Sequence, residues 1–320
     1  MDAGKTIQLG FVIPVETSGA LRRLPSAEEI DRALGLIAGR FDSAWTVDHL
    51  QFGEADVLEG FTALTWYAAR HPRLRFGNAV LCQSFRNPAH LAKMAATLQN
   101  LSGGRFILGL GACWHPEEFA AYGYEFPPAG VRVDQLREAV QIIGSLWREE
   151  TTTFRGQHCH VTEARCLPRP LPAPPIMIGA FGPRMLRLAV ELADWWNVSS
   201  TGLAEYRAMA AAVNTHCAAI GRDPASLGRS WIGACACAVS EAQAMELAGG
   251  AGDDEDFSFV GTPDQVLEQM SAFVHLGVDT FIFDCAGFPD LSTLQTILDH
   301  ISPRLFELAE MLPYERTEQT

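Results

Sequence analysis

Short apolar segments alternate with longer amphipathic segments along almost all of this 320-residue chain. Segments that are apolar along their whole length are typical of parallel strands covered by helices. Eight strand-then-helix repeats favour a closed (β/α)8 barrel over an open sheet, so we predict an α/β fold of the TIM-barrel class with insertions. The predicted strands are residues 7–14, 43–49, 74–82, 105–112, 174–181, 194–200, 230–239 and 280–287.

The starts of three helices are marked by capping residues. Ser26 followed by Glu29 has the spacing of a capping box, in which each side chain bonds to the other's backbone N–H. Asn87 and Pro88 supply an N-cap and a first-turn proline for the helix after the third strand. Thr262 begins a similar pattern after the seventh strand. These signals support helices between the predicted strands.

We assign residues 1–320 to a single barrel domain that carries two insertions. Residues 115–173 combine a polar loop, a helix, a hairpin pattern and a proline-rich stretch. Residues 240–259 contain the acidic run 253–256, which is typical of a solvated loop. The His-Cys-His triplet at 158–160 indicates a surface hairpin rather than a metal site, because alternate residues of a strand face opposite sides. We therefore predict no metal site.

Charge and cysteine usage restrict the class of partner. The formal net charge of −14 argues against a nucleic-acid or anionic-membrane partner. No apolar stretch approaches the ~18 residues that would indicate a membrane span. Eight cysteines lack paired spacing, and several lie in apolar runs, so we expect reduced, buried thiols and a cytoplasmic protein. Those in apolar runs are Cys82, Cys235, Cys237 and Cys285.

Catalytic side chains in a barrel of this type gather where the strands end and the following loops begin. Asp48 and His49 lie at the end of the second strand, where a histidine is suited to proton transfer near neutral pH. The alternative is a histidine that only orders its loop. The same rule selects Cys82, Gln83, Ser84, Gly111–Trp114, Ala180–Arg184, Ser199, Ser200, Asp284 and Cys285.

Two small-residue turns at these strand ends suggest an anion site. Gly109 and Gly111 begin the dinucleotide pattern G-x-G-x-x-G, but Trp114 occupies the last glycine position, and the segment follows the fourth strand instead of the first. A Rossmann sheet is therefore excluded. Gly182 and Pro183 lead into a helix whose first turn carries Arg184, which fits either an anion site or an ordinary strand-to-helix turn.

Four segments together resemble the bacterial-luciferase-like superfamily of flavin- and deazaflavin-dependent oxidoreductases. They are WTVDHL, NAVLCQSFRNPAHLAKMAATLQNLSGGRFILGLGACW, PPIMIGAFGPRMLRLAVELADWWN and VGTPDQVLEQM, at residues 45–50, 78–114, 174–197 and 260–270. They occur in the family's order between residues 45 and 270. The sequence of residues 85–112 is most similar to the subfamily of probable coenzyme F420-dependent oxidoreductases.

The resemblance implies a barrel that holds coenzyme F420, or FMN as the alternative, at the carboxyl ends of the strands. It implies a non-prolyl cis peptide between Ala79 and Val80 that supports the cofactor ring, and a proton-handling role for His49 beside Asp48. Relatives commonly have glycine where Cys113 stands. The implied cofactor-binding residues are Ala79, Val80, Cys82, Gly111, Ala112, Cys113, Trp114, Gly179, Ala180, Phe181, Gly182, Pro183 and Arg184.

The leading functional hypothesis is a coenzyme F420-dependent oxidoreductase that moves a hydride between the deazaflavin and a small organic substrate. The nearest alternative is an FMN-dependent luciferase-like monooxygenase. An alternative of another class is a barrel that binds a flavin without turnover. Relatives are often dimers, so the resemblance also implies a homodimer as the assembly to test.

Overall fold

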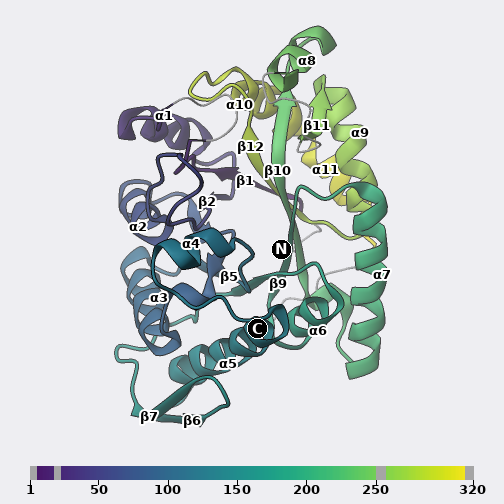
Figure 1. The fold of residues 1–320 in the computed structure, drawn as a ribbon. Coiled ribbons are helices and arrows are strands. Elements are labelled where there is room, and N and C mark those ends of the chain that lie inside the picture. The colour runs from purple at the N-terminus through teal and green to yellow at the C-terminus, as the bar shows by residue number, and fades with distance from the viewer. Residues whose placement is uncertain (1–5, 18–22, 250–256, 314–320) are drawn as a thin grey trace.

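The computed structural model of the protein describes residues 6–17, 23–249 and 257–313. Within these residues, parallel strands form a closed ring in which each strand pairs with two neighbours. The ring closes because the first strand pairs with the last, and Figure 1 shows it enclosed by helices. The ring strands are β1 (Gln8–Val12), β2 (Ser43–Thr46), β3 (Arg75–Asn78), β5 (Phe106–Gly111), β8 (Ile176–Gly179), β9 (Trp195–Ser199), β10 (Gly228–Cys237) and β12 (Thr280–Cys285). The predicted TIM barrel is confirmed, and every predicted strand range overlaps one of these strands.

Four further strands lie outside this ring. β4 (Leu81–Cys82) follows β3 and pairs with β5, while β11 (Phe257–Gly261) pairs with β10. β6 (Thr152–Arg155) and β7 (His160–Ala164) form a separate antiparallel pair within the first insertion, which confirms the predicted hairpin.

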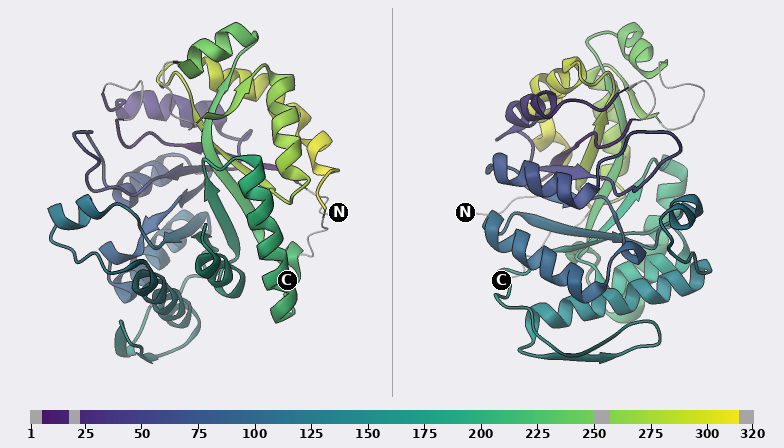
Figure 2. Two further views of the ribbon diagram at one scale, coloured as in Figure 1. Left: turned by 45° about the vertical axis from the view of Figure 1, so that its right-hand side comes forward. Right: turned by 60° about the vertical axis from the view of Figure 1, so that its left-hand side comes forward.

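Helices cover the outer face of the barrel, as the views in Figure 2 show from two sides. In the described chain none of them is both long enough and apolar enough to cross a membrane. The helices are α1 (Ala27–Ile37), α2 (Gly60–Arg70), α3 (Pro88–Ser102), α4 (Pro116–Ala121), α5 (Ala129–Arg148), α6 (Pro183–Leu192), α7 (Leu203–Ile220), α8 (Glu241–Gly249), α9 (Pro263–Val274), α10 (Ser292–Thr296) and α11 (Leu305–Ala309).

The three predicted helix caps are confirmed. Ser26 and Thr262 each form a complete capping box, and the Asn87 side chain accepts hydrogen bonds from the backbone of the first turn of α3. Two segments that we expected to be loops contain short helices instead. α4 forms because Pro116 suits the first helical turn and Phe119 is buried, while α8 buries Ala244. The acidic run 253–256 lies outside the described residues.

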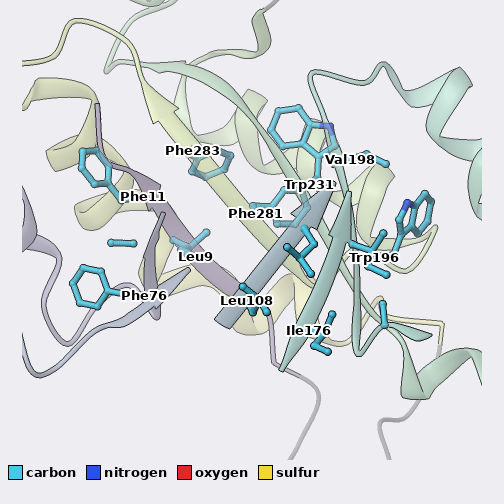
Figure 3. Close-up of a cluster of buried hydrophobic side chains, with 14 of the residues drawn as sticks. Leu9, Phe11, Phe76, Leu108, Ile176, Trp196, Val198, Trp231, Phe281 and Phe283 are labelled. Atoms are coloured by element: carbon cyan, nitrogen blue, oxygen red, sulfur yellow. The ribbon is translucent and has the colours of Figure 1, made fainter. Parts of the chain in front are cut away.

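The alternation of side chains along the strands divides the core into two layers. Outward-facing residues pack against the helices, and Figure 3 shows part of this layer around Phe76, Leu108, Trp196 and Trp231. Trp231 and Trp196 are fully buried in this layer, so they serve packing. The inner cluster fills the barrel below the strand ends with Val12, Trp45, Ile107, Met177, Trp195, Ile232 and Ile282.

Gly109 allows β5 to approach β3 unusually closely. A Cβ atom added at Gly109 would lie 1.8 Å from the carbonyl oxygen of Asn78, where no side chain fits. The positions of Val80, which follows β3, and of Gly111, at the end of β5, depend on this close approach. The first glycine of the sequence pattern is therefore needed for packing.

We predict that Gly109→Ala lowers the free energy of unfolding by roughly 2–3 kcal/mol, because a backbone carbonyl cannot move aside as a side chain can. Urea unfolding measures the change. The matched control is Gly35→Ala in the exposed interior of α1, where an added Cβ meets nothing within 4 Å. This control is expected to raise stability by about 0.5–1 kcal/mol. Equal effects of the two substitutions would contradict the packing argument.

Candidate functional site

A cavity of about 550 Å³ lies at the carboxyl ends of the barrel strands. Its lining residues come from the ends of β1, β2, β5, β8, β9, β10 and β12, from β4 and from the first insertion. Most are apolar, which is typical of sites for cofactors and small molecules. Of the residues predicted at the strand ends, the lining includes Asp48, His49, Ala79, Val80, Cys82, Gly111, Ala112, Cys113, Trp114, Gly179, Phe181, Gly182, Ser199, Ser200 and Asp284.

One wall of the cavity is built around the peptide bond between Ala79 and Val80, which is cis as expected. The Val80 side chain lies between two glycines from neighbouring strands. A Cβ at Gly111 would be 2.6 Å from Val80 Cγ2, and one at Gly179 would be 3.1 Å from the same atom. The absence of side chains at these glycines therefore makes room for Val80 and leaves this part of the wall flat.

A buried ion pair holds the ends of β2 and β4 together. The Asp48 side chain is fully buried and accepts hydrogen bonds from Arg86 Nη1 at 2.6 Å and Arg86 Nη2 at 2.7 Å. It also accepts from the backbone N–H of Cys82 at 2.7 Å. Burial acts to lower the pKa of Arg86, but the hydrogen bonds and charges of Asp48 and Glu59 outweigh it and raise that pKa.

The hydrogen-bond partner of His49 is Glu118 rather than its neighbour Asp48, whose carboxylate is engaged by Arg86 and Cys82. His49 Nδ1 lies 2.7 Å from Glu118 Oε1, and the backbone N–H of Leu50 donates to Glu118 Oε2 at 2.7 Å. Glu118 is only 3% exposed. Since a carboxylate oxygen only accepts, Nδ1 of His49 donates and Nε2 is left able to exchange a proton with a ligand.

Aromatic rings surround His49 on its other sides. Phe52 and Trp114 lie 4.9 Å and 6.1 Å from it between ring centroids, and His115 lies at 6.3 Å. Trp114 and His115 line the cavity. These contacts restrict the imidazole to one region of the cavity wall.

The expectation that all cysteines are reduced thiols is wrong for Cys82, which forms a disulfide with Cys113. This bond joins β4 to the turn after β5, and both residues line the cavity. Cys113 has a left-handed backbone (φ 62°), which is uncommon for a residue other than glycine. The expectation holds for Cys235, Cys237 and Cys285, which are free and buried. Burial raises their pKa values, that of Cys237 to about 12.

The turn between β8 and α6 contributes fewer residues to the cavity lining than we expected. Phe181 and Gly182 line the cavity, and Gly182 is the N-cap of α6. Ala180 is buried and its carbonyl accepts a hydrogen bond from Trp196, so it does not line the cavity. Pro183 and Arg184 also lie outside the lining. Arg184 is exposed and donates to Asp134 at 2.7 Å.

Several lining residues were not predicted, and Glu118 is the most important of them. Its only sequence signal is an acidic pair after a proline, which is also typical of a solvated first turn. Three further predicted residues are not part of the cavity lining: Gln83, Ser84 and Cys285. The unpredicted lining residues are Val12, Val47, Leu81, Phe85, His115, Glu118, Phe119, Met185, Asn197, Ile232, Gly233 and Ala234.

Comparison with known proteins relates this site to a family. The family model described as luciferase-like monooxygenase matches residues 7–254. An F420-dependent glucose-6-phosphate dehydrogenase from Kineococcus radiotolerans is 36% identical over 163 residues, which are 50% of this chain and 48% of that protein. The chain thus spans about half the length of such curated relatives in the match.

Solved structures share the fold. An F420-dependent secondary alcohol dehydrogenase superposes with a TM-score of 0.79 at 16% identity, over 92% of this chain and 98% of that one. EDTA monooxygenase from Chelativorans sp. BNC1 superposes with a TM-score of 0.79 at 17% identity, over 98% and 97% of the two chains. At such identities the likeness shows the fold alone.

We predict that the double substitution Cys82→Ala and Cys113→Ala lowers the free energy of unfolding by roughly 2–4 kcal/mol, because the bond closes a loop across 31 positions. Thermal unfolding with and without dithiothreitol measures this. The reductant should lower the Tm of the wild type but not that of the double variant. Cys159→Ala, which removes a free thiol outside the cavity, is the matched control. A wild-type Tm that does not change when the bond is reduced would contradict the prediction.

Proposed function

We propose, from the premise that this chain belongs to the family of luciferase-like monooxygenases, that it is a coenzyme F420-dependent oxidoreductase. In this proposal it moves a hydride between the deazaflavin and a small organic substrate. The observation that carries the proposal is the His49–Glu118 pair in the wall of an apolar cavity, beside the Ala79–Val80 peptide. Curated relatives named as F420-dependent enzymes support the choice of cofactor.

The residues present fit a planar cofactor ring. Val80 lines the cavity between Gly111 and Gly179, neither of which projects a side chain beside it. Ala79, Cys82 and the 111–114 turn continue this wall of the cavity. When bound, the deazaflavin supplies the hydride chemistry, and the protein supplies orientation and proton handling.

The anionic part of the cofactor would be held at the start of α6. Gly182 is the N-cap of a ten-residue helix, and the free N–H groups of a first helical turn favour negative charge. Phe181 and Gly182 lie in the cavity lining. Arg184 would assist from outside the lining if it exchanges Asp134 for the ligand.

His49 is the residue that we assign to proton transfer. Glu118 holds Nδ1, so that Nε2 takes a proton from the substrate or returns one to it. Glu118 is a positioning residue in this scheme, because it acts through His49. Asp48 is also a positioning residue, since its carboxylate bonds to Arg86 and to the backbone of Cys82. A cytoplasmic location belongs to the same proposal.

An FMN-dependent monooxygenase is the second candidate, and the family's own description favours it. The test is to titrate the purified apoprotein with coenzyme F420 and with FMN, followed by cofactor fluorescence. We expect saturable binding of the deazaflavin at concentrations at least tenfold lower than for FMN. Preferential binding of FMN would replace the proposal with the second candidate, and binding of neither would refute both.

We predict that His49→Ala lowers kcat by at least about 100-fold, the lower end of the contribution of a positioned acid or base. Cofactor affinity should change less than about twofold, because the flat wall around Val80 remains. Steady-state kinetics and fluorescence titration measure the two quantities. His90→Ala, which removes an exposed histidine from α3, is the matched control. Loss of cofactor binding with unchanged kcat would make His49 a cofactor ligand instead.

We predict that Glu118→Gln reverses the hydrogen bond at His49. The backbone N–H of Leu50 keeps the amide oxygen facing it, so the amide NH₂ faces His49 Nδ1 and donates to it. The ring proton of neutral His49 is then confined to Nε2. Ring ¹⁵N chemical shifts report this change directly, and kcat should fall while cofactor affinity stays. Unaltered ¹⁵N shifts would contradict the positioning role.

A further inference from the structure

The end of the cavity near His49 is lined by carboxylates and histidines. Its charged or titratable lining residues are Asp48, His49, His115, Glu118 and Asp284. Among the described residues that line the cavity, none is lysine or arginine. Two guanidinium groups from outside the lining bond its members: Arg86 is engaged by Asp48 and Glu59, and Arg132 donates to the backbone carbonyls of Ala112 and Cys113. The charge inventory is therefore negative where the substrate would meet His49.

Asp284 is the carboxylate most available to a ligand. It lies at the carboxyl end of β12, and its side chain is exposed to the cavity while protein surrounds it. Within the described part of the chain, no hydrogen bond or ion pair engages its carboxylate. Burial by the surrounding protein raises the pKa of Asp284.

Glu16 adds a second carboxylate, which lies outside the cavity lining but interacts electrostatically with Asp284. It follows β1, the strand that pairs with β12, and its backbone bridges to Val57. Its Oε2 atom is buried and has no hydrogen-bond partner. Burial raises the pKa of Glu16, the charge of His49 lowers it, and the charges of Asp284 and Glu118 raise it. The Glu16 carboxyl therefore lies within electrostatic reach of the proton-handling pair.

The carboxylates at this end of the cavity discriminate between ligands by the charge of the ligand. An anionic group brought beside Asp284 and Glu16 loses hydration and gains no lysine or arginine partner, whereas sites for phosphate esters supply such cations or helix amides. The amide-rich start of α6 is assigned to the cofactor's own anionic part. An uncharged polar molecule meets no such penalty, and a cation is attracted.

We propose that Glu16 and Asp284 act as a charge filter, and that the substrate of this enzyme carries no phosphate or carboxylate group. The inference rests on the proposed function, since it concerns the substrate of the cofactor-loaded enzyme. The substrate class is a neutral or cationic organic molecule whose apolar part contacts Phe85, Phe119 and Ile232. Sugar phosphates, on which the curated relatives act by name, are excluded from this class.

The test measures how charged and uncharged quenchers reach the deazaflavin bound to the intact protein. Iodide is anionic and acrylamide is neutral, and both quench an accessible fluorophore. We expect iodide to quench the bound cofactor several-fold less than acrylamide does, relative to the free cofactor. Asp284→Asn and Glu16→Gln should each raise the iodide quenching constant roughly threefold, the effect of removing one unit charge at close range in a wet cavity. Acrylamide quenching should stay constant, which also shows that the variants fold.

Glu310→Gln is the matched control, because it removes an exposed carboxylate outside the cavity lining. It should leave both quenching constants unchanged. Equal access of iodide and acrylamide in the wild type, or no response to the substitutions at Asp284 and Glu16, would overturn the charge filter.

A turnover measurement is the second part of the test. Millimolar glucose 6-phosphate should not reduce the bound deazaflavin above the background rate. Reduction of the bound cofactor by glucose 6-phosphate would overturn the inference while leaving the proposed function intact. Failure of the deazaflavin to bind at all would refute the proposed function instead, so the two failures are distinguishable.

Discussion

The buried carboxylate of Asp48 is the constraint on which the rest of the site depends. It accepts hydrogen bonds from both terminal nitrogens of Arg86 and from the backbone of Cys82, so it ties the end of β2 to β4. Removing one partner of such a pair would leave a buried charge unpaired, which is costly. Because His49 follows Asp48 in the chain, the same bonds fix the backbone that presents the imidazole. The disulfide of Cys82 extends this restraint to the 113–118 segment and hence to Glu118.

The sequence predicts those parts of the molecule that local rules govern. Uniformly apolar runs and helix caps can be recognised from short stretches of sequence. The barrel, the caps at Ser26 and Asn87 and the hairpin at 152–164 are therefore predictable from such stretches. The strand-end rule then places His49 on the cavity wall. The cis bond at Ala79–Val80 came from resemblance to a family, because no propensity of alanine or valine predicts it.

The pairings that complete the site could not be predicted, because they are tertiary. Glu117 and Glu118 are adjacent in the first turn of α4, yet the Glu117 side chain is 80% exposed and that of Glu118 is 3% exposed. Nothing in the local pattern distinguishes them, since only the approach of residues 49–51 decides which one is buried. Cys82 and Cys113 are likewise 31 positions apart and meet only because β4 pairs with β5. Asp48 adjoins His49 in the sequence, yet its carboxylate bonds to Arg86 and to the backbone of Cys82.

The residues that build the barrel differ from the residues that set the charge of its cavity. A shared fold therefore does not determine the charge of the cavity. Gly109, Gly111 and Gly179 are required by packing around Asn78 and Val80, so they belong to any chain with this wall. Asp284 and the Oε2 atom of Glu16 make no hydrogen bond in the described structure that would tie them to the fold. Substitutions there can change the class of substrate without loss of the barrel or of the His49–Glu118 pair. The fold can therefore be shared with proteins named as F420-dependent glucose-6-phosphate dehydrogenases while, under the charge filter proposed above, the charge of the substrate differs.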